Sequence, residues 1–199
     1  GGPFIKLFSN KKIFDPIRED GPTDHIIKKI GTPTMGGVII LIGLIVAVLL
    51  WADLTNIYIL FCLYIVTTFG LLGAYDDYKK IKTTSSTGIS SRSKMFVQIL
   101  LALLGLIVLT YFVEYEEFKN LYFPFFKNLF INLSWFFIPF SIFVIVGSSN
   151  AVNLTDGLDG LATVPVILVA GCFAFISYVT GNIVFSKYLQ ILYIEGAGE

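Results

Sequence analysis

Residues 54–75 read LTNIYILFCLYIVTTFGLLGAY, a run of 22 residues without a charged side chain. Four more charge-free runs cover residues 31–52, 95–113, 128–155 and 160–186. Each contains an apolar core of about 17–20 residues, enough for a helix to cross roughly 30 Å of hydrocarbon. A membrane β-barrel would require alternating apolar and polar positions, which these runs lack. The sequence therefore predicts an all-α integral membrane protein, folded as a polytopic helix bundle.

We expect five transmembrane helices in a single membrane domain that comprises residues 1–199. The expected spans are 35–52, 57–75, 95–113, 131–149 and 161–180. A cleaved signal peptide would account for at most one of them. Charged residues make up 14% of the chain, whereas a soluble domain carries roughly 25%. The lipid bilayer is thus an expected partner. Nucleic acid is not, because the net charge is zero and no basic stripe occurs.

The distribution of basic residues predicts the orientation in the membrane. With five spans, residues 1–34, 76–94 and 150–160 lie on one side and hold 11 of the 14 Lys and Arg residues. Short loops rich in Lys and Arg remain in the cytoplasm. The unusual polar motifs of the chain all lie in these three segments, so we expect them on the cytoplasmic face.

Residues 150–160, NAVNLTDGLDG, place two carboxylates, two side-chain amides and two glycines between apolar runs. Ionisable groups in or beside a membrane are usually functional. Asp156 and Asp159 have the i,i+3 spacing that shares one face of a helix. Both could instead stabilise the N-terminus of the following span. That alternative leaves the amides of Asn150 and Asn153 and the adjacent glycines unexplained.

A second motif comprises DDYKK at residues 76–80 and GISSRSK at residues 88–94. Asp76 and Asp77 arrive at the C-terminal end of the second span, where acids oppose the helix dipole. One interpretation is that the helix continues and nearby lysines form ion pairs with them. The other is an active site, in which the adjacent acids, on different helix faces, have different roles.

A third motif, GTPTMGG at residues 31–37, follows two lysines at the entry to the first span. It could be a capped helix start with lysines reaching toward water. It could also be an anion site, with helix amides and Lys29 facing a phosphate. Carboxylates, amides and lysines on one membrane face suit a Mg²⁺-assisted reaction at a phosphate or diphosphate. One substrate would come from the cytosol and the other from the bilayer.

The runs at residues 31–37, 76–80, 88–94 and 150–162 resemble those of the phospho-N-acetylmuramoyl-pentapeptide transferases. This family belongs to the polyprenyl-phosphate N-acetylhexosamine-1-phosphate transferases. The resemblance implies a Mg²⁺-dependent enzyme that transfers phospho-MurNAc-pentapeptide from UDP-MurNAc-pentapeptide to undecaprenyl phosphate, which releases UMP and forms lipid I for peptidoglycan. It implies a multi-pass protein of the bacterial cytoplasmic (inner) membrane, with cytoplasmic active-site loops and the capacity to form a homodimer.

The resemblance also implies roles for individual residues. The expected catalytic residues are Asp76, Asp77, Lys80 and Asp156. Asp76 would act as a base on the lipid phosphate, or an aspartate would act as a covalent nucleophile. The expected substrate-binding residues are Lys29, Thr34, Arg92, Lys94, Asn153, Gly157, Leu158 and Asp159. Asp76 and Asp77 are candidate contributors to the metal site. The main metal ligand of the family is an aspartate in a later loop, which we expect to be absent from this chain.

The family has about ten spans and this chain has five, so we expect a fragment that is inactive alone. A sibling enzyme that transfers GlcNAc-1-phosphate to a polyprenyl phosphate is an alternative function. A non-enzymatic transporter is a further alternative, although it would place ionisable groups near the bilayer centre rather than at one interface.

Overall fold

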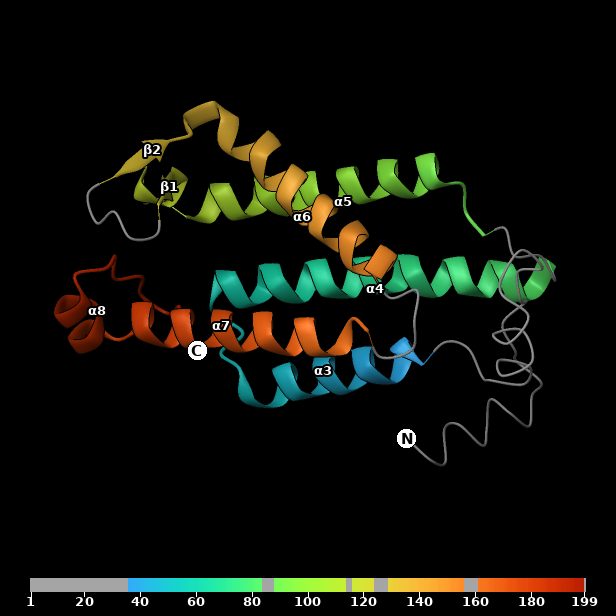
Figure 1. Ribbon diagram of the computed structural model, residues 1–199, viewed down its shortest axis with the longest axis horizontal. Helices are drawn as coiled ribbons and strands as arrows, with labels where there is room; N and C mark the ends of the chain where they lie inside the picture. The colour runs from blue at the N-terminus through green and yellow to red at the C-terminus, as the bar shows by residue number, and fades with distance from the viewer. Residues whose placement is uncertain (1–35, 84–87, 114–115, 124–128, 156–160, 199) are drawn as a thin grey trace. The chain divides into compact units, whose positions relative to one another are not determined.

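The computed structural model describes residues 36–83, 88–113, 116–123, 129–155 and 161–198. Within these ranges the chain is predominantly helical, with one small β-sheet (Figure 1). The α-helices are α3 (Gly37–Trp51), α4 (Ile57–Thr83), α5 (Ser91–Phe112), α6 (Phe137–Thr155), α7 (Thr163–Gly181) and α8 (Ile183–Leu189). The expected helical, polytopic membrane architecture is confirmed.

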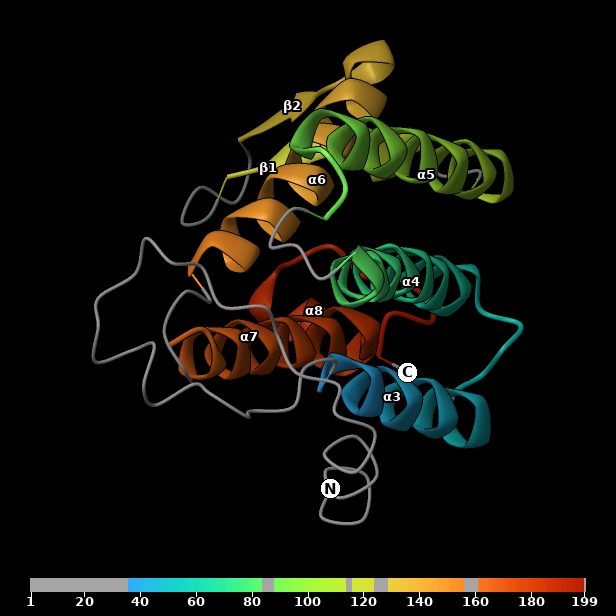
Figure 2. The same ribbon diagram turned by 90° about the vertical axis from the view of Figure 1, so that its right-hand side faces the viewer.

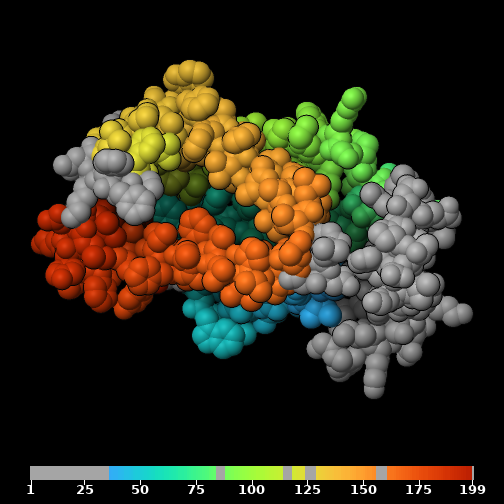
Figure 3. Space-filling view, viewed as in Figure 1, coloured from blue at the N-terminus to red at the C-terminus, as the bar shows by residue number. Residues whose placement is uncertain are grey.

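Four helical segments are long and apolar enough to cross a membrane: Ile57–Thr83, Ser91–Phe112, Ser134–Thr155 and Thr163–Gly181. Helix α3 is apolar but shorter, with 15 residues. Large apolar side chains on α7, including Leu168 and Phe173, are exposed. In Figure 3 the orange-red surface of α7 is open to the outside. Such surfaces suit contact with lipid tails, which are as apolar as leucine.

Three helices differ from the expected spans by four or more residues, and one of them, α5, begins at Ser91 instead of residue 95. Helix α4 continues past residue 75 to Thr83, because the residues after the acids are mostly good helix formers and Asp76 pairs with Lys80 at i,i+4. Helix α6 begins at Phe137 instead of residue 131 and continues to Thr155 instead of residue 149. Asn150 and Asn153 are therefore helical.

The described chain forms two compact units. The first contains α3, residues 63–83 of α4 and residues 91–98 of α5. In this unit Leu41 of α3 lies against Gly70 of α4, where a Cβ atom would come within 2.7 Å of Leu41 Cδ2. The glycine thus lets an α3 side chain approach the α4 backbone closely, as small residues do between membrane helices.

The second unit contains residues 52–62 and 99–198 of the described chain. Its sheet pairs β1 (Asn120–Tyr122) with β2 (Phe130–Asn132) in antiparallel register, Leu121 opposite Ile131. Figure 2 shows these strands side by side. The Asn132 side-chain amide donates to Asn120 Oδ1 at 2.8 Å. The 3₁₀ helices η1 (Glu116–Lys119) and η2 (Ser134–Phe136) flank the sheet, and η2 leads directly into α6.

Asn56 holds the start of α4 in this second unit. Its Oδ1 accepts the Tyr58 amide at 2.9 Å, and its Nδ2 donates to the Gly196 carbonyl at 2.7 Å. Gly196 has a φ of 75°, which glycine adopts readily. Nearby, the amide and hydroxyl of Thr55 donate to Asp53 and hold the pKa of that exposed carboxyl below its usual range. The buried side chains of α5 in this unit, Ala102, Leu106 and Leu109, share one helix face.

Candidate active site

The geometry of helix α4 determines how far the acidic pair lies along the helix from its start. The rise from Ile57 to Asp76 is about 28 Å, because each residue of an α-helix adds about 1.5 Å. This is close to the roughly 30 Å thickness of the hydrocarbon core. Residues 76–83 of the helix therefore extend past the charge-free run. They present Asp76, Asp77, Lys79, Lys80 and Lys82 there.

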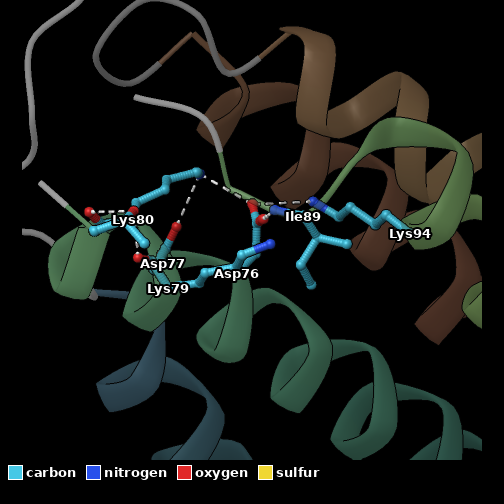
Figure 4. Close-up of polar contacts among 7 residues, drawn as sticks. Asp76, Asp77, Lys79, Lys80, Ile89 and Lys94 are labelled. Carbon is cyan, nitrogen blue, oxygen red and sulfur yellow. Dashed lines mark hydrogen bonds and ion pairs between the residues drawn. The ribbon is translucent and has the colours of Figure 1, made fainter. Parts of the chain in front are cut away.

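Asp76 is the most enclosed charged group in the described chain, with 7% of the residue exposed. Its Oδ1 accepts the backbone amide of Ile89 at 2.6 Å. Its Oδ2 lies 3.0 Å from Lys80 Nζ and 3.8 Å from Lys94 Nζ (Figure 4). A buried carboxylate needs such partners, since an unpaired charge away from water is strongly destabilising.

Lys80 bridges the two acids. Its ammonium group contacts Asp76 and also Oδ1 of Asp77 at 3.2 Å. On a helix surface, a residue is a neighbour of the residues three and four positions before it. Lys80 can therefore contact both Asp77 and Asp76, although the two acidic side chains point in different directions. The side chain of Asp77 is 37% exposed, against 10% for Asp76. The two carboxylates thus have different environments, and the ion pairs considered in the sequence are present.

The residues at the start of α5 supply the remaining contacts to the Asp76 carboxylate. Ser90 caps this helix: its hydroxyl accepts the Ser93 amide at 3.2 Å and its carbonyl accepts the Lys94 amide at 2.9 Å. The chain just before the cap delivers the Ile89 amide to Asp76. One turn into α5, Lys94 reaches the same carboxylate, whereas Arg92 is exposed. An acid beside a helix N-terminus is also favoured by the helix dipole.

The other predicted site residues are distributed differently. Asn153 lies exposed in the last turn of α6, in the second unit. Six lie outside the described residues: Lys29, Thr34, Asp156, Gly157, Leu158 and Asp159. The expected approach of Asp156 to Asp76 also lies outside the described residues and stays a prediction.

Two groups of this cluster were missed from the sequence, the Ile89 amide and Gly88. A backbone donor has no residue-type signature, so Ile89 could not be selected by its side chain. The one feature of the sequence that could have indicated this close approach was Gly88, two residues before the serine that caps α5. Such a glycine lets the chain pass close to another group.

The cluster has the groups needed for phosphate chemistry, namely two ammonium groups and an accessible carboxylate. Among the described residues, no group of three or more His, Cys, Asp and Glu side chains could hold a metal ion. Mg²⁺ commonly takes only one or two carboxylates and completes its shell with water and substrate phosphates. The accessible carboxylate of Asp77 fits such a partial ligand, and Asp76 fits less well because donors face both of its oxygens.

Comparison with known proteins agrees with the sequence motifs. The model of "Glycosyl transferase family 4" matches residues 57–198, and "Phospho-N-acetylmuramoyl-pentapeptide-transferase signature 1" matches residues 29–41. The chain is 71% identical over 199 residues to the phospho-N-acetylmuramoyl-pentapeptide-transferase of Pelagibacter ubique (strain HTCC1062), covering all of this chain and 55% of that protein. It is 51% identical over 184 residues to the protein of that name from Bartonella quintana (strain Toulouse), covering 92% of this chain and 50% of the relative.

The chain therefore spans about half the length of the curated relatives it matches. The resemblance found in the sequence motifs is confirmed by both the signature and the relatives. Because the family model extends over most of the chain, from residue 57 to residue 198, the chain belongs to glycosyl transferase family 4.

Proposed function

We propose that this chain forms part of an enzyme that transfers phospho-MurNAc-pentapeptide from its UDP carrier to undecaprenyl phosphate. The reaction releases UMP and forms lipid I for peptidoglycan synthesis in the bacterial inner membrane. The observation that carries the proposal is the cluster of Asp76, Asp77, Lys80 and Lys94 at the end of a membrane helix. The names of the two relatives supply the substrate class.

In the proposed reaction, an oxygen of the lipid phosphate attacks the sugar-bound phosphorus of the nucleotide substrate. The bond between that phosphorus and the bridging oxygen of UMP breaks. A carboxylate, Asp76 or Asp77, takes the proton of the lipid phosphate and later releases it to water. Alternatively, a carboxylate attacks the phosphorus first and the lipid phosphate displaces it. Both routes need a carboxylate beside ammonium groups, which the cluster contains.

The lysines have a separate role in this proposal. Negative charge spreads over the transferring phosphoryl group and the departing UMP, and positioned cations stabilise that charge. Lys80 and Lys94 approach from different helices, so they could contact different phosphate oxygens. Asp77, and to a lesser extent Asp76, would hold Mg²⁺, which would supply further positive charge against the phosphates.

The remaining site residues are proposed from sequence position. Asp156 would join the catalytic groups, and the others would contact the substrates: Lys29, Thr34, Arg92, Asn153, Gly157, Leu158 and Asp159. These positions lie in the segments expected on the cytoplasmic face. The sibling GlcNAc-1-phosphate transfer is less favoured, because the matched signature and both relatives carry the muramoyl name.

The test measures UMP release by the full-length protein that carries this segment, with undecaprenyl phosphate and saturating Mg²⁺. UDP-MurNAc-pentapeptide should support release and UDP-GlcNAc should not. Asp76→Asn should lower kcat by roughly 10²–10⁴-fold, the range for general acid–base groups, with binding of the nucleotide substrate retained.

Asp53→Asn is the matched control, since the carboxylate of this exposed acid accepts hydrogen bonds from its neighbour Thr55 and takes no part in the Asp76 cluster. Its kcat should equal that of the unsubstituted protein. Near-normal UMP release from Asp76→Asn would reject a catalytic role for Asp76. Release from UDP-GlcNAc alone would replace the muramoyl substrate by the sibling reaction.

A further inference from the structure

Gly88 lies directly against the carboxylate of Asp76. A Cβ atom at position 88 would overlap Oδ1 of Asp76, and it would lie 2.8 Å from Asp76 Cγ and 2.9 Å from Lys80 Cε. Real Cβ atoms essentially never approach heavy atoms this closely. Any side chain at position 88 would therefore push the Asp76 carboxylate or the start of α5 out of place.

The need for glycine at this position is one of space and not of backbone conformation. Among the glycines in the described ranges, only Gly196 has a positive φ. The φ of Gly88 thus lies outside the left-handed region that favours glycine. A methyl group at position 88 would therefore act mainly through its overlap with Asp76 and Lys80.

The close approach of Gly88 has a second consequence, which concerns the orientation of the carboxylate. Because the chain passes so near, the next amide, that of Ile89, reaches Asp76 Oδ1 at 2.6 Å. The lysines then face Oδ2 (Figure 4). A carboxylate offers about four lone-pair positions. The Ile89 amide holds one oxygen, and Lys80 at 3.0 Å with Lys94 at 3.8 Å holds the other, so the carboxylate is fixed from both sides in one orientation.

We propose that Gly88 is a positioning residue for Asp76. It allows the turn before α5 to close on the carboxylate, so that the Ile89 amide fixes the oxygens in the orientation used for phosphoryl transfer. This inference rests on the proposed function for its catalytic consequence. The packing of Gly88 on Asp76 is independent of that function and can be tested separately.

The first experiment measures steady-state kinetics of Gly88→Ala in the full-length protein. A displacement of about 1 Å at a reacting group can lower the rate by about 10²-fold, so we expect kcat to fall by about 10–100-fold. KM for the nucleotide substrate should stay nearly constant, since Gly88 acts through Asp76 and not on the substrate. Gly43→Ala is the matched control, because a Cβ atom there meets nothing within 4 Å. Its kcat should not change.

The second experiment reads the position of Asp76 without using activity. A carbodiimide and a small amine are used to label accessible carboxyl groups, and mass spectrometry of fragment ions separates Asp76 from Asp77. In the unsubstituted protein, Asp77 should label faster, because its side chain is 37% exposed and that of Asp76 is 10% exposed. In Gly88→Ala, labelling of Asp76 should rise to the level of Asp77.

A double variant covers the case in which Gly88→Ala fails to fold. Asp76→Ala removes the carboxylate that the new methyl group would overlap, so adding Gly88→Ala to it should cause no further loss of stability. Unchanged labelling of Asp76 in a folded Gly88→Ala protein would overturn the inference, whatever happens to kcat. A double variant that fails to fold, or is clearly less stable, where Asp76→Ala alone folds would overturn it as well. If the unsubstituted protein releases no UMP, the proposed function falls and the labelling result still decides the role of Gly88.

Discussion

Asp76 and Asp77 allow a comparison in which the chemical change is the same and only the environment differs. Asp→Asn at either position removes one negative charge and relieves the same repulsion between the two acids. At position 76, asparagine can still accept the Ile89 amide, but its own NH₂ group would then face Lys80 and Lys94. The difference between the two variants therefore isolates the contacts of the Asp76 carboxylate.

The size of this difference follows from the geometry. A hydrogen bond to a charged group contributes about 1.5–3 kcal/mol, and the 3.0 Å contact of Asp76 with Lys80 falls in this class. The 3.8 Å contact with Lys94 is too long for a hydrogen bond and adds up to about 1 kcal/mol as an ion pair. We therefore expect Asp76→Asn to lower the free energy of unfolding by about 1.5–4 kcal/mol.

Asp77→Asn should lower the same quantity by no more than about 1 kcal/mol. This side chain is partly exposed, and Lys80 keeps Asp76 as a partner when Asp77 is neutral. The assay is denaturant-induced loss of helical circular dichroism for the full-length protein in detergent, with both variants measured beside the unsubstituted protein. Equal destabilisation by the two variants would refute the conclusion that Asp76 is the more strongly held carboxylate.

Two further expectations concern the ends of α4. Asn56→Ala should lower the free energy of unfolding by about 1 kcal/mol, the usual effect of losing a helix cap, because it removes the contacts to Tyr58 and Gly196. An unchanged unfolding midpoint would show that the Asn56 contacts contribute nothing. In intact cells, an impermeant thiol reagent should label a cysteine at residue 120 and not one at residue 86, once Cys62 and Cys172 are replaced. The reverse pattern would invert the proposed orientation.

The helical, membrane-spanning character of the chain could be predicted because it depends on the length of apolar runs. The limits of α4 could not, because a helix and the hydrocarbon that surrounds it need not end at the same residue. The sequence ends the span at residue 75, before the first acid, whereas the helix continues to Thr83. Asp76 and Lys80 stabilise this extension across one turn, a contact that a hydropathy pattern does not contain.

The limits of α6 were missed for a different reason. Residues 130–132 belong to an apolar run and read as the start of a span, but they pair as β2 with residues 120–122. Pairing between segments ten residues apart depends on backbone hydrogen bonds and register, which hydropathy does not report. At the other end, the helix continues through Asn150 and Asn153 because neither asparagine forces a break.

In the candidate site, the acids and lysines were predicted as residue types, whereas their separate environments were not. The sequence places Asp76 and Asp77 on different helix faces and allows them different roles, but it does not say which of the two is enclosed. The structure encloses the first and leaves the second accessible, because the turn at Gly88 and Ile89 closes only on Asp76. This distinction depends on a contact between residues 13 positions apart, the Asp76 side chain and the Ile89 backbone amide, and a backbone amide cannot be recognised from residue type.

The position of Asp76 along α4 indicates which molecules could meet at the proposed site. A helix that enters the hydrocarbon at Ile57 brings Asp76 to the opposite boundary after about 28 Å, if it runs nearly straight across. A lipid phosphate lies at this same level, anchored by its chain, and a nucleotide sugar arrives there from water. A transporter would need its ionisable groups near the midplane, about ten residues earlier on α4. That part of α4, around Val66 and Thr67, carries no charged side chain. The position of the cluster along its helix therefore favours a transfer between a lipid-borne and a water-borne phosphate over passage through the membrane.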